Sequence, residues 1–197
     1  MVGNQSNFSC HDVVRCFLLL RSRGSRAFLM DALELGEGTV RSILDLLKTR
    51  GLVTSTKGGH SYTPAGEALH QQVNTIIGEM KRVQSDSLYP GFNKAALVVK
   101  APDCSVRLNY ELRDVAIRAG ADGAVIFVYD RGLKLPDSGY QEDFSEFERP
   151  FDLKEGHLLI LSFAKTYRMS ESGAIAVALK LNRCLRESLA QLSNVPG

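Results

Sequence analysis

Apolar residues recur at three- and four-residue intervals in the first part of the chain, and this spacing predicts three short amphipathic helices. We expect the first over residues 11–23 and the second over residues 26–34, with a third beginning after Gly36. Ser9 and Asp12 form the S-x-x-D pattern of a capping box at the start of the first helix. The third helix has a distinct inward face. Its inward residues are Val40, Ile43, Leu44 and Leu47.

A β-hairpin is expected directly after the third helix. Residues 52–56 and 61–63 read as short strands on either side of Lys57-Gly58-Gly59-His60, where the paired glycines supply the positive φ of a tight turn. Thr63 as N-cap and Pro64 at the first helical position then restart a helix. Three helices, a hairpin and a further helix in this order predict a winged helix-turn-helix, a fold that places one helix in the DNA major groove.

Residues 8 to about 84 resemble winged-helix transcription regulators of the MarR-like superfamily. The resemblance rests on Thr39-Val40-Arg41-Ser42-Ile43-Leu44 and Tyr62-Thr63-Pro64-Ala65-Gly66, which match that superfamily's recognition helix and wing exit. The whole layout also resembles uncharacterised archaeal regulators, in which such a module precedes a small domain of unknown function. The resemblance implies a DNA-binding transcription regulator. Glu37 and Asp45 depart from the pattern, because they place carboxylates on or near a surface that would face phosphate.

Polar side chains of the second and third helices and of the hairpin are the expected DNA contacts. We expect Arg41 and Ser42 at base edges and the other basic groups at phosphates, which supply most non-specific affinity. Residues 1–90 carry 10 Lys and Arg against 8 Asp and Glu in a chain of net charge +2, so binding should be moderate and sensitive to salt. The expected DNA-binding residues are Arg26, Thr39, Arg41, Ser42, Lys48, Arg50, Lys57 and His60.

A long fourth helix is expected from Pro64 to about Gln84, and it carries an apolar seam at intervals of four and three residues. Winged-helix regulators usually read two half-sites, so this seam predicts a homodimer. The alternative is that the seam packs against its own domain. The seam residues are Leu69, Val73, Ile76, Met80 and Val83.

Residues 85–93 contain Pro90-Gly91 and are expected to be a linker. Beyond this segment, the pattern of apolar residues along the chain changes. Helices are expected after Ser105 and from Ser170 to about Leu192. Apolar runs predict one buried strand before the first of these helices and further strands between the two. The expected strands are residues 95–99, 124–129, 133–135 and 158–164, with at most one helical turn in the acidic loop 136–150.

These elements define the expected fold class, α+β or α/β. A winged helix-turn-helix domain over residues 1–84 is followed by a small α/β domain over residues 94–197 with the element order β-α-β-β-β-α. The order of the strands within the sheet does not follow from the sequence.

One candidate ligand site stands out in the second domain. The strand over residues 158–164 runs into a helix N-terminus, and helix N-termini and strand carboxyl ends attract anions and ligands. Lys165, Arg168, Ser170 and Ser172 would suit a phosphate or carboxylate. The alternatives are an ordinary capped loop or carboxylates of the acidic loop bound to Arg168. No catalytic, metal-ligating or G-x-G-x-x-G pattern accompanies this site, so we expect no cofactor.

The composition sets the remaining expectations. The 197 residues contain no apolar run of membrane-spanning length and begin with a polar segment unlike a signal peptide, so we expect a cytoplasmic protein. The sequence as a whole predicts a transcription regulator with a ligand-sensing or assembly domain. The alternatives are an enzyme in the second domain, with the winged helix as a targeting or autoregulatory module, and a protein-interaction module.

Overall fold

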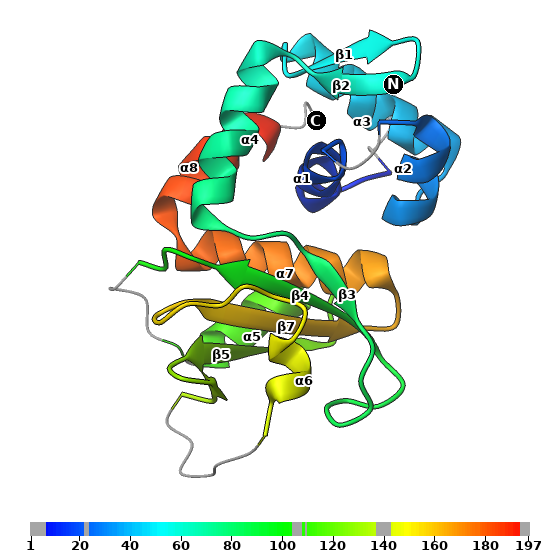
Figure 1. Cartoon of the computed structure of the whole chain (residues 1–197). Helices are drawn as coiled ribbons and strands as arrows, with labels where there is room; N and C mark the ends of the chain where they lie inside the picture. The colour runs from blue at the N-terminus through cyan, green and yellow to red at the C-terminus, as the bar shows by residue number, and fades with distance from the viewer. Residues whose placement is uncertain (1–6, 22–23, 104–107, 109, 137–142, 194–197) are drawn as a thin grey trace. The chain divides into compact units, whose positions relative to one another are not determined.

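The computed structural model describes residues 7–21, 24–103, 108, 110–136 and 143–193, and it is a mixed α/β protein (Figure 1). The described residues form two compact units. The first contains the residues up to Gln72 together with those from Glu187 onward, and the second contains Val73–Arg186. The first unit is mainly helical and the second contains a β-sheet. The division falls inside a helix, before the segment that the sequence suggests as a linker.

Three helices open the first unit, as the apolar spacing predicts. They are α1 (Cys10–Leu19), α2 (Arg26–Leu33) and α3 (Glu37–Thr49). The capping box at α1 is confirmed, since the Asp12 amide donates to Ser9 Oγ and the Ser9 amide donates to Asp12 Oδ2. The predicted end of the first helix at residue 23 is wrong for the described part, because α1 ends at Leu19 and residues 22–23 lie outside the described residues.

The predicted hairpin is also present. Strands β1 (Val53–Thr56) and β2 (Gly59–Tyr62) pair antiparallel, with Thr56 opposite Gly59. The turn is therefore shorter than predicted, because Gly59 and His60 belong to the second strand. Gly59 still needs a glycine conformation, since its φ is +132°.

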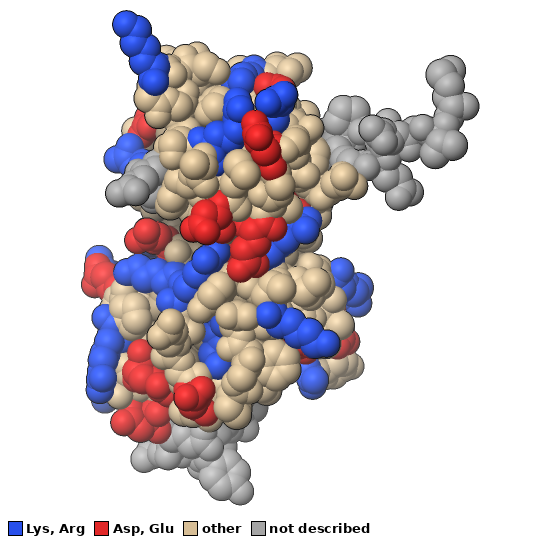
Figure 2. All heavy atoms as spheres, turned by 90° about the vertical axis from the view of Figure 1, so that its right-hand side faces the viewer, with Lys and Arg blue, Asp and Glu red and all other residues tan. Residues whose placement is uncertain are grey.

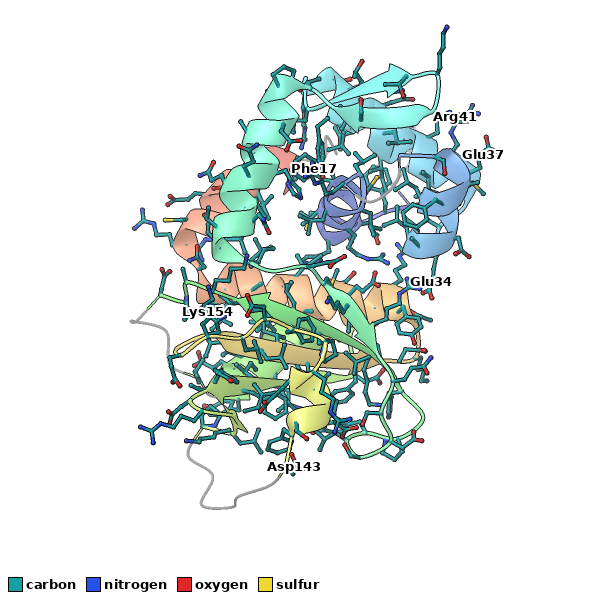
Figure 3. The ribbon with its side chains drawn as sticks, in the orientation of Figure 1. Phe17, Glu34, Glu37, Arg41, Asp143 and Lys154 are labelled. Atoms are coloured by element: carbon teal, nitrogen blue, oxygen red, sulfur yellow. The ribbon has the colours of Figure 1, made fainter. Side chains whose placement is uncertain are left out.

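The inward face of α3 is buried as predicted. Val40, Ile43 and Leu47 are completely shielded from solvent. Phe17 of α1 points into the same core (Figure 3), and its carbonyl accepts a hydrogen bond from the Tyr62 hydroxyl of β2. The hairpin and the helices of the first unit therefore share one core.

The fourth helix, α4 (Pro64–Ile76), begins as predicted but ends eight residues earlier than the predicted Gln84. Thr63 Oγ1 caps its start by accepting from the Gly66 amide at 3.1 Å. The helix ends because the chain next joins the sheet of the second unit: the Gly78 amide donates to the Val98 carbonyl at 2.9 Å, and Ile76 O accepts from the Lys100 amide at 2.7 Å. Sheet pairing replaces the helical hydrogen bonds at this point.

This early end removes the predicted dimer seam. Met80 follows α4 in a non-helical segment, and Val83 lies in a strand. Leu69, Val73 and Ile76 are buried within the chain, with exposures of 5%, 1% and 7%. These three residues therefore face the interior of their own chain. An exposed seam on α4 is not available to a second copy.

The second unit is built on one sheet of strand order β3-β4-β7-β5-β6, in which every neighbouring pair is antiparallel. The three inner strands were predicted as buried runs, and they are the long ones. The edge strand β3 was missed because it lies in the predicted extension of α4. The bounds are β3 (Lys81–Val83), β4 (Asn93–Val99), β5 (Gly123–Tyr129), β6 (Leu133–Lys134) and β7 (Leu158–Ala164).

Helices cover both faces of this sheet (Figure 1). Helices α5 (Tyr110–Arg118) and α7 (Tyr167–Leu181) pack against each other and against one face. The short α6 (Ser145–Glu148) lies on the other face, where Phe147 packs with Phe127 of β5 in a common apolar cluster. The predicted N-cap at Ser105 lies outside the described residues.

The last predicted helix is in fact two. Asn182 interrupts it with extended backbone (φ −140°, ψ 117°) between α7 and α8 (Arg183–Ser193). Its side-chain oxygen accepts from the Leu185 amide at 2.6 Å, so Asn182 caps the new helix. In the first unit, α8 contacts α4 through a hydrogen bond from Gln72 Nε2 to Ser188 Oγ at 2.9 Å.

Candidate nucleic-acid interface

The outward face of α3 carries the polar side chains that the sequence places there. Arg41 and Ser42 are exposed, and Thr39 is half-buried. Ser42 Oγ donates to the Gly38 carbonyl at 3.0 Å, a local bond that a competing hydrogen-bond partner can replace. Because the opposite face of α3 is buried in the core, the helix holds these side chains in a fixed position.

Glu37 joins two of the expected DNA contacts. As the first residue of α3 it lies where the helix dipole favours a carboxylate. Its Oε1 accepts from Arg26 Nη1 of α2 at 3.3 Å and from Arg41 Nη2 at 3.2 Å. Glu37 and Arg41 point outward from the first unit (Figure 3). We call these three side chains the Glu37 clasp. They are exposed enough that the clasp contributes little to folding stability.

Lys48 lies in the last turn of α3. It pairs with Asp45 at 3.1 Å. The pKa of His60 in β2 is lowered, first by partial burial and further by the positive charges of Lys48 and Arg26. Arg26 of α2 and Arg41 of α3 share the Glu37 carboxylate, and His60 of the hairpin lies 3.3 Å from the carbonyl of Gly24, two residues before Arg26.

The hairpin is fixed to the connection between α1 and α2 by a close backbone contact that the sequence analysis missed. The His60 amide donates to the Gly24 carbonyl at 2.8 Å, and His60 Nδ1 lies 3.3 Å from the same oxygen. A Cβ on Gly24 would fall 1.6 Å from the His60 carbonyl oxygen, and one on Gly59 would fall 2.4 Å from the Gly24 oxygen. No local pattern in the sequence indicates this contact, because it joins segments 36 residues apart.

The remaining expected DNA contacts differ in how accessible their side chains are to DNA. Lys57 is exposed at the tip of the hairpin. Arg50 is half-buried, and its Nη1 donates to the carbonyl of Gln191 in α8. Arg50 therefore has a structural partner in the first unit, and a phosphate would have to share or replace it. Figure 2 shows the resulting surface in its upper part, where cationic side chains alternate with carboxylates.

The predicted anion site in the second unit is corrected by the position of the helix start. The N-cap of α7 is Thr166 and not Ser170, since Thr166 Oγ1 accepts from the Met169 amide at 3.2 Å. The sheet is also antiparallel, whereas the rule that ligands bind at strand carboxyl ends concerns open parallel sheets. Neither argument therefore supports an anion site at this position.

The two serines of that site are structural. Ser170 and Ser172 are 0% and 4% exposed. Their hydroxyls donate to the carbonyls of Tyr167 at 3.1 Å and Arg168 at 2.8 Å, inside the helix. Lys165 is exposed and Arg168 is half-buried. The structure therefore does not bring the four predicted ligand groups together around a common point.

A cavity of about 300 Å³ lies elsewhere in the second unit, beside α6. Its polar lining comes from Tyr129, Ser145, Glu148, Arg149 and Asp152. Within the described residues, no group of three or more His, Cys, Asp and Glu side chains could hold a metal ion. Within the same residues, no helix has the length and apolar character needed to cross a bilayer.

Comparison with known proteins finds relatives for both units. Residues 9–68 match the family model described as PH0730-like, N-terminal domain, and residues 90–181 match the domain of unknown function DUF4443. Among solved structures, the chain is similar to the hypothetical protein PH0730 from Pyrococcus horikoshii OT3. The two are 27% identical with a TM-score of 0.80, over 94% of this chain and 100% of that chain. A search of the curated proteins finds no match. The resemblance to an archaeal protein is thus confirmed over nearly the whole chain.

Proposed function

We propose that this protein is a DNA-binding transcription regulator whose first unit is a winged helix-turn-helix. In this proposal α3 is the recognition helix and the β1–β2 hairpin is the wing. The observation that supports it best is the convergence of polar side chains from three separate segments on one surface. These side chains are Arg26 of α2, Arg41 of α3 and His60 of the hairpin.

The dimensions of α3 suit a groove-binding role. Its 13 residues span about 20 Å at 1.5 Å per residue. A helix is about 10–12 Å across with its side chains, and the major groove is about 12 Å wide. The exposed Arg41 and Ser42 lie in the N-terminal half of α3, the part of a recognition helix that contacts base edges.

The Glu37 clasp refines this proposal. Arginine reads guanine through two parallel hydrogen bonds, and the bonds cost less when the guanidinium is already held in place. Glu37 holds Arg41 through Nη2, while 59% of the Arg41 side chain stays exposed. The same carboxylate reduces the positive potential near phosphates, so non-specific affinity should be low and a larger share of the binding energy should come from base contacts.

The second unit is proposed to serve assembly or regulation. Its sheet and helices form a compact body of their own. A regulator of this class would act by changing the placement of two recognition helices. Such a change requires a ligand or partner with different affinities for the two arrangements.

The base-reading role of Arg41 can be tested with a duplex selected by the full-length chain from a random-sequence library. We expect Arg41→Ala to weaken binding to the selected duplex by about 1–3 kcal/mol and to relax the sequence preference. Lys57→Ala should weaken selected and random duplexes alike, and should reduce the slope of log K against log salt by about 1, because Lys57 contacts phosphate. Fluorescence anisotropy titrations at several salt concentrations measure both effects.

Lys154→Ala is the matched control, since Lys154 is an exposed cation in the second unit (Figure 3). It should bind both duplexes as the wild type does. An Arg41→Ala protein that loses the same factor on selected and random DNA would show that Arg41 does not read bases. A library from which no sequence is enriched would contradict the proposed function itself.

A further inference from the structure

The second unit exposes apolar side chains on one side of its helical layer. Tyr110 and Ile117 of α5 are 76% and 43% exposed, and Met169 of α7 is 43% exposed. Met169 lies next to the end of α5, because its Cγ is 3.9 Å from where a Cβ on Gly120 would be. Exposed apolar side chains gathered in this way mark interaction surfaces more often than single ones do.

The outer face of α5 has a defined pattern. Leu112 and Ala116 point inward and are buried, so Tyr110 and Ile117, seven residues apart, share the outward face. Arg113 and Asp114 lie between them and are exposed. Within the residues that the structure describes, neither of these two charges takes part in an ion pair. The outer face is therefore an apolar stripe with one unpaired charge of each sign at its centre.

We propose that the outer face of α5 binds a second copy of this chain, with the two α5 helices antiparallel about a two-fold axis. An axis midway between Arg113 and Asp114 is also midway between Tyr110 and Ile117. The pairing therefore places Tyr110 against the partner's Ile117, and Arg113 against the partner's Asp114. The two-fold repeats both contacts, as an isologous interface requires.

The charge pattern favours a second copy over another partner. One opposite-charge pair on each side of the axis makes this face complementary to itself in the antiparallel arrangement, and like charges would meet if the helices ran parallel. The predicted seam on α4 cannot serve this role, because its helical residues Leu69, Val73 and Ile76 are buried. The α5 surface also contains none of the residues that are expected to contact DNA.

The size of the face predicts a weak dimer. Nine helical residues extend only about 13 Å, and stable interfaces usually bury more than about 1,200 Å² in total. Association of free protein is therefore expected near the micromolar range or weaker. Two adjacent half-sites on DNA would strengthen it by raising the effective concentration. The α5 pairing itself goes beyond the proposed function and does not depend on it.

Two charge reversals test the arrangement by sedimentation equilibrium of the full-length chain without DNA. Arg113→Asp should place two carboxylates opposite each other at both contacts, and Asp114→Arg should place two cations there. We expect each variant alone to raise the dimer dissociation constant about tenfold or more, because like charges in contact oppose association. Both substitutions are on an exposed helix face, so circular dichroism should show an unchanged fold.

An equimolar mixture of the two variants is the decisive sample. The acidic variant and the basic variant restore an opposite-charge pair at both contacts, so the mixture should dimerise within about threefold of the wild type. Lys154→Asp, a charge reversal outside α5, should leave the dissociation constant unchanged. A wild type that stays monomeric at several hundred micromolar would overturn the proposal. So would single variants that dimerise normally, or a mixture that remains as weak as its components. None of these results would bear on whether the monomer binds DNA.

Discussion

Arg15→Met is expected to lower the free energy of unfolding by about 3–5 kcal/mol, the usual cost of removing one partner of a buried ion pair. Arg15 is completely buried, and its Nη1 lies 3.0 Å from Asp12 Oδ1. Methionine approximates the length of the arginine stem but leaves the Asp12 carboxylate in the core without its cation. The loss therefore comes mainly from an uncompensated charge and not from a cavity.

Arg15 also donates hydrogen bonds at the end of α2, and the loss of these bonds adds to the destabilisation by Arg15→Met. Its guanidinium donates to the carbonyls of Leu33 at 3.2 Å and Ala32 at 3.4 Å. These carbonyls lie in the last turn of α2, where no helical donor is left for them, and a cation is favoured there. Arg15 thereby connects the start of α1 with the end of α2.

Urea unfolding followed by circular dichroism measures this prediction. Arg21→Met is the matched control, because Arg21 pairs with Glu67 at 3.5 Å with 65% of its side chain exposed. The control should change stability by no more than about 0.5 kcal/mol. Equal effects of the two substitutions would show that the buried pair does not stabilise the first unit.

Gly24→Ala is expected to destabilise the first unit by about 2–3 kcal/mol, at the upper end of the range for overpacking. The new methyl group would fall 1.6 Å from the His60 carbonyl oxygen, a backbone atom that a side-chain rotation cannot move. Relief requires the hairpin to move away, which also breaks the 2.8 Å bond from the His60 amide to Gly24. Hydrogen exchange at the His60 amide should therefore become faster.

Gly38→Ala is the contrasting substitution in the same unit. Nothing lies within 4 Å of a Cβ at Gly38, which is inside α3, so alanine should stabilise that helix by up to about 1 kcal/mol. Thermal unfolding of the two variants should therefore shift in opposite directions. A Gly24→Ala protein as stable as the wild type, with an unchanged His60 exchange rate, would contradict the close contact between hairpin and helices.

Local signals were sufficient to predict most of the first unit. The capping box at Ser9, the apolar spacing of α3 and the Thr63 cap all act within four residues along the chain, and the structure confirms each of them. The strand Leu158–Ala164 was likewise predicted at its observed bounds, because a continuous apolar run between polar segments leaves little choice of register.

The errors concern contacts between segments far apart in the sequence. Residues beyond Ile76 kept a helical apolar spacing, but their backbone groups pair with β4, and no pattern within the helix shows this. Ser170 was predicted as the N-cap of the last helix, but the N-cap of α7 is Thr166, one turn earlier. The burial of Arg15 was not predicted, because it depends on contacts with the end of α2. The Glu37 clasp was missed for the same reason.

Chemical modification of the bound DNA tests most directly the central claim, that α3 enters the major groove. Dimethyl sulfate methylates guanine N7 in the major groove and adenine N3 in the minor groove, so one reagent probes both. On a duplex selected by the full-length chain, methylation at specific guanine N7 positions should prevent binding, and Arg41→Ala should abolish the interference at one of them. Interference at adenine N3 alone, or at no base of a selected duplex, would contradict a recognition helix in the major groove.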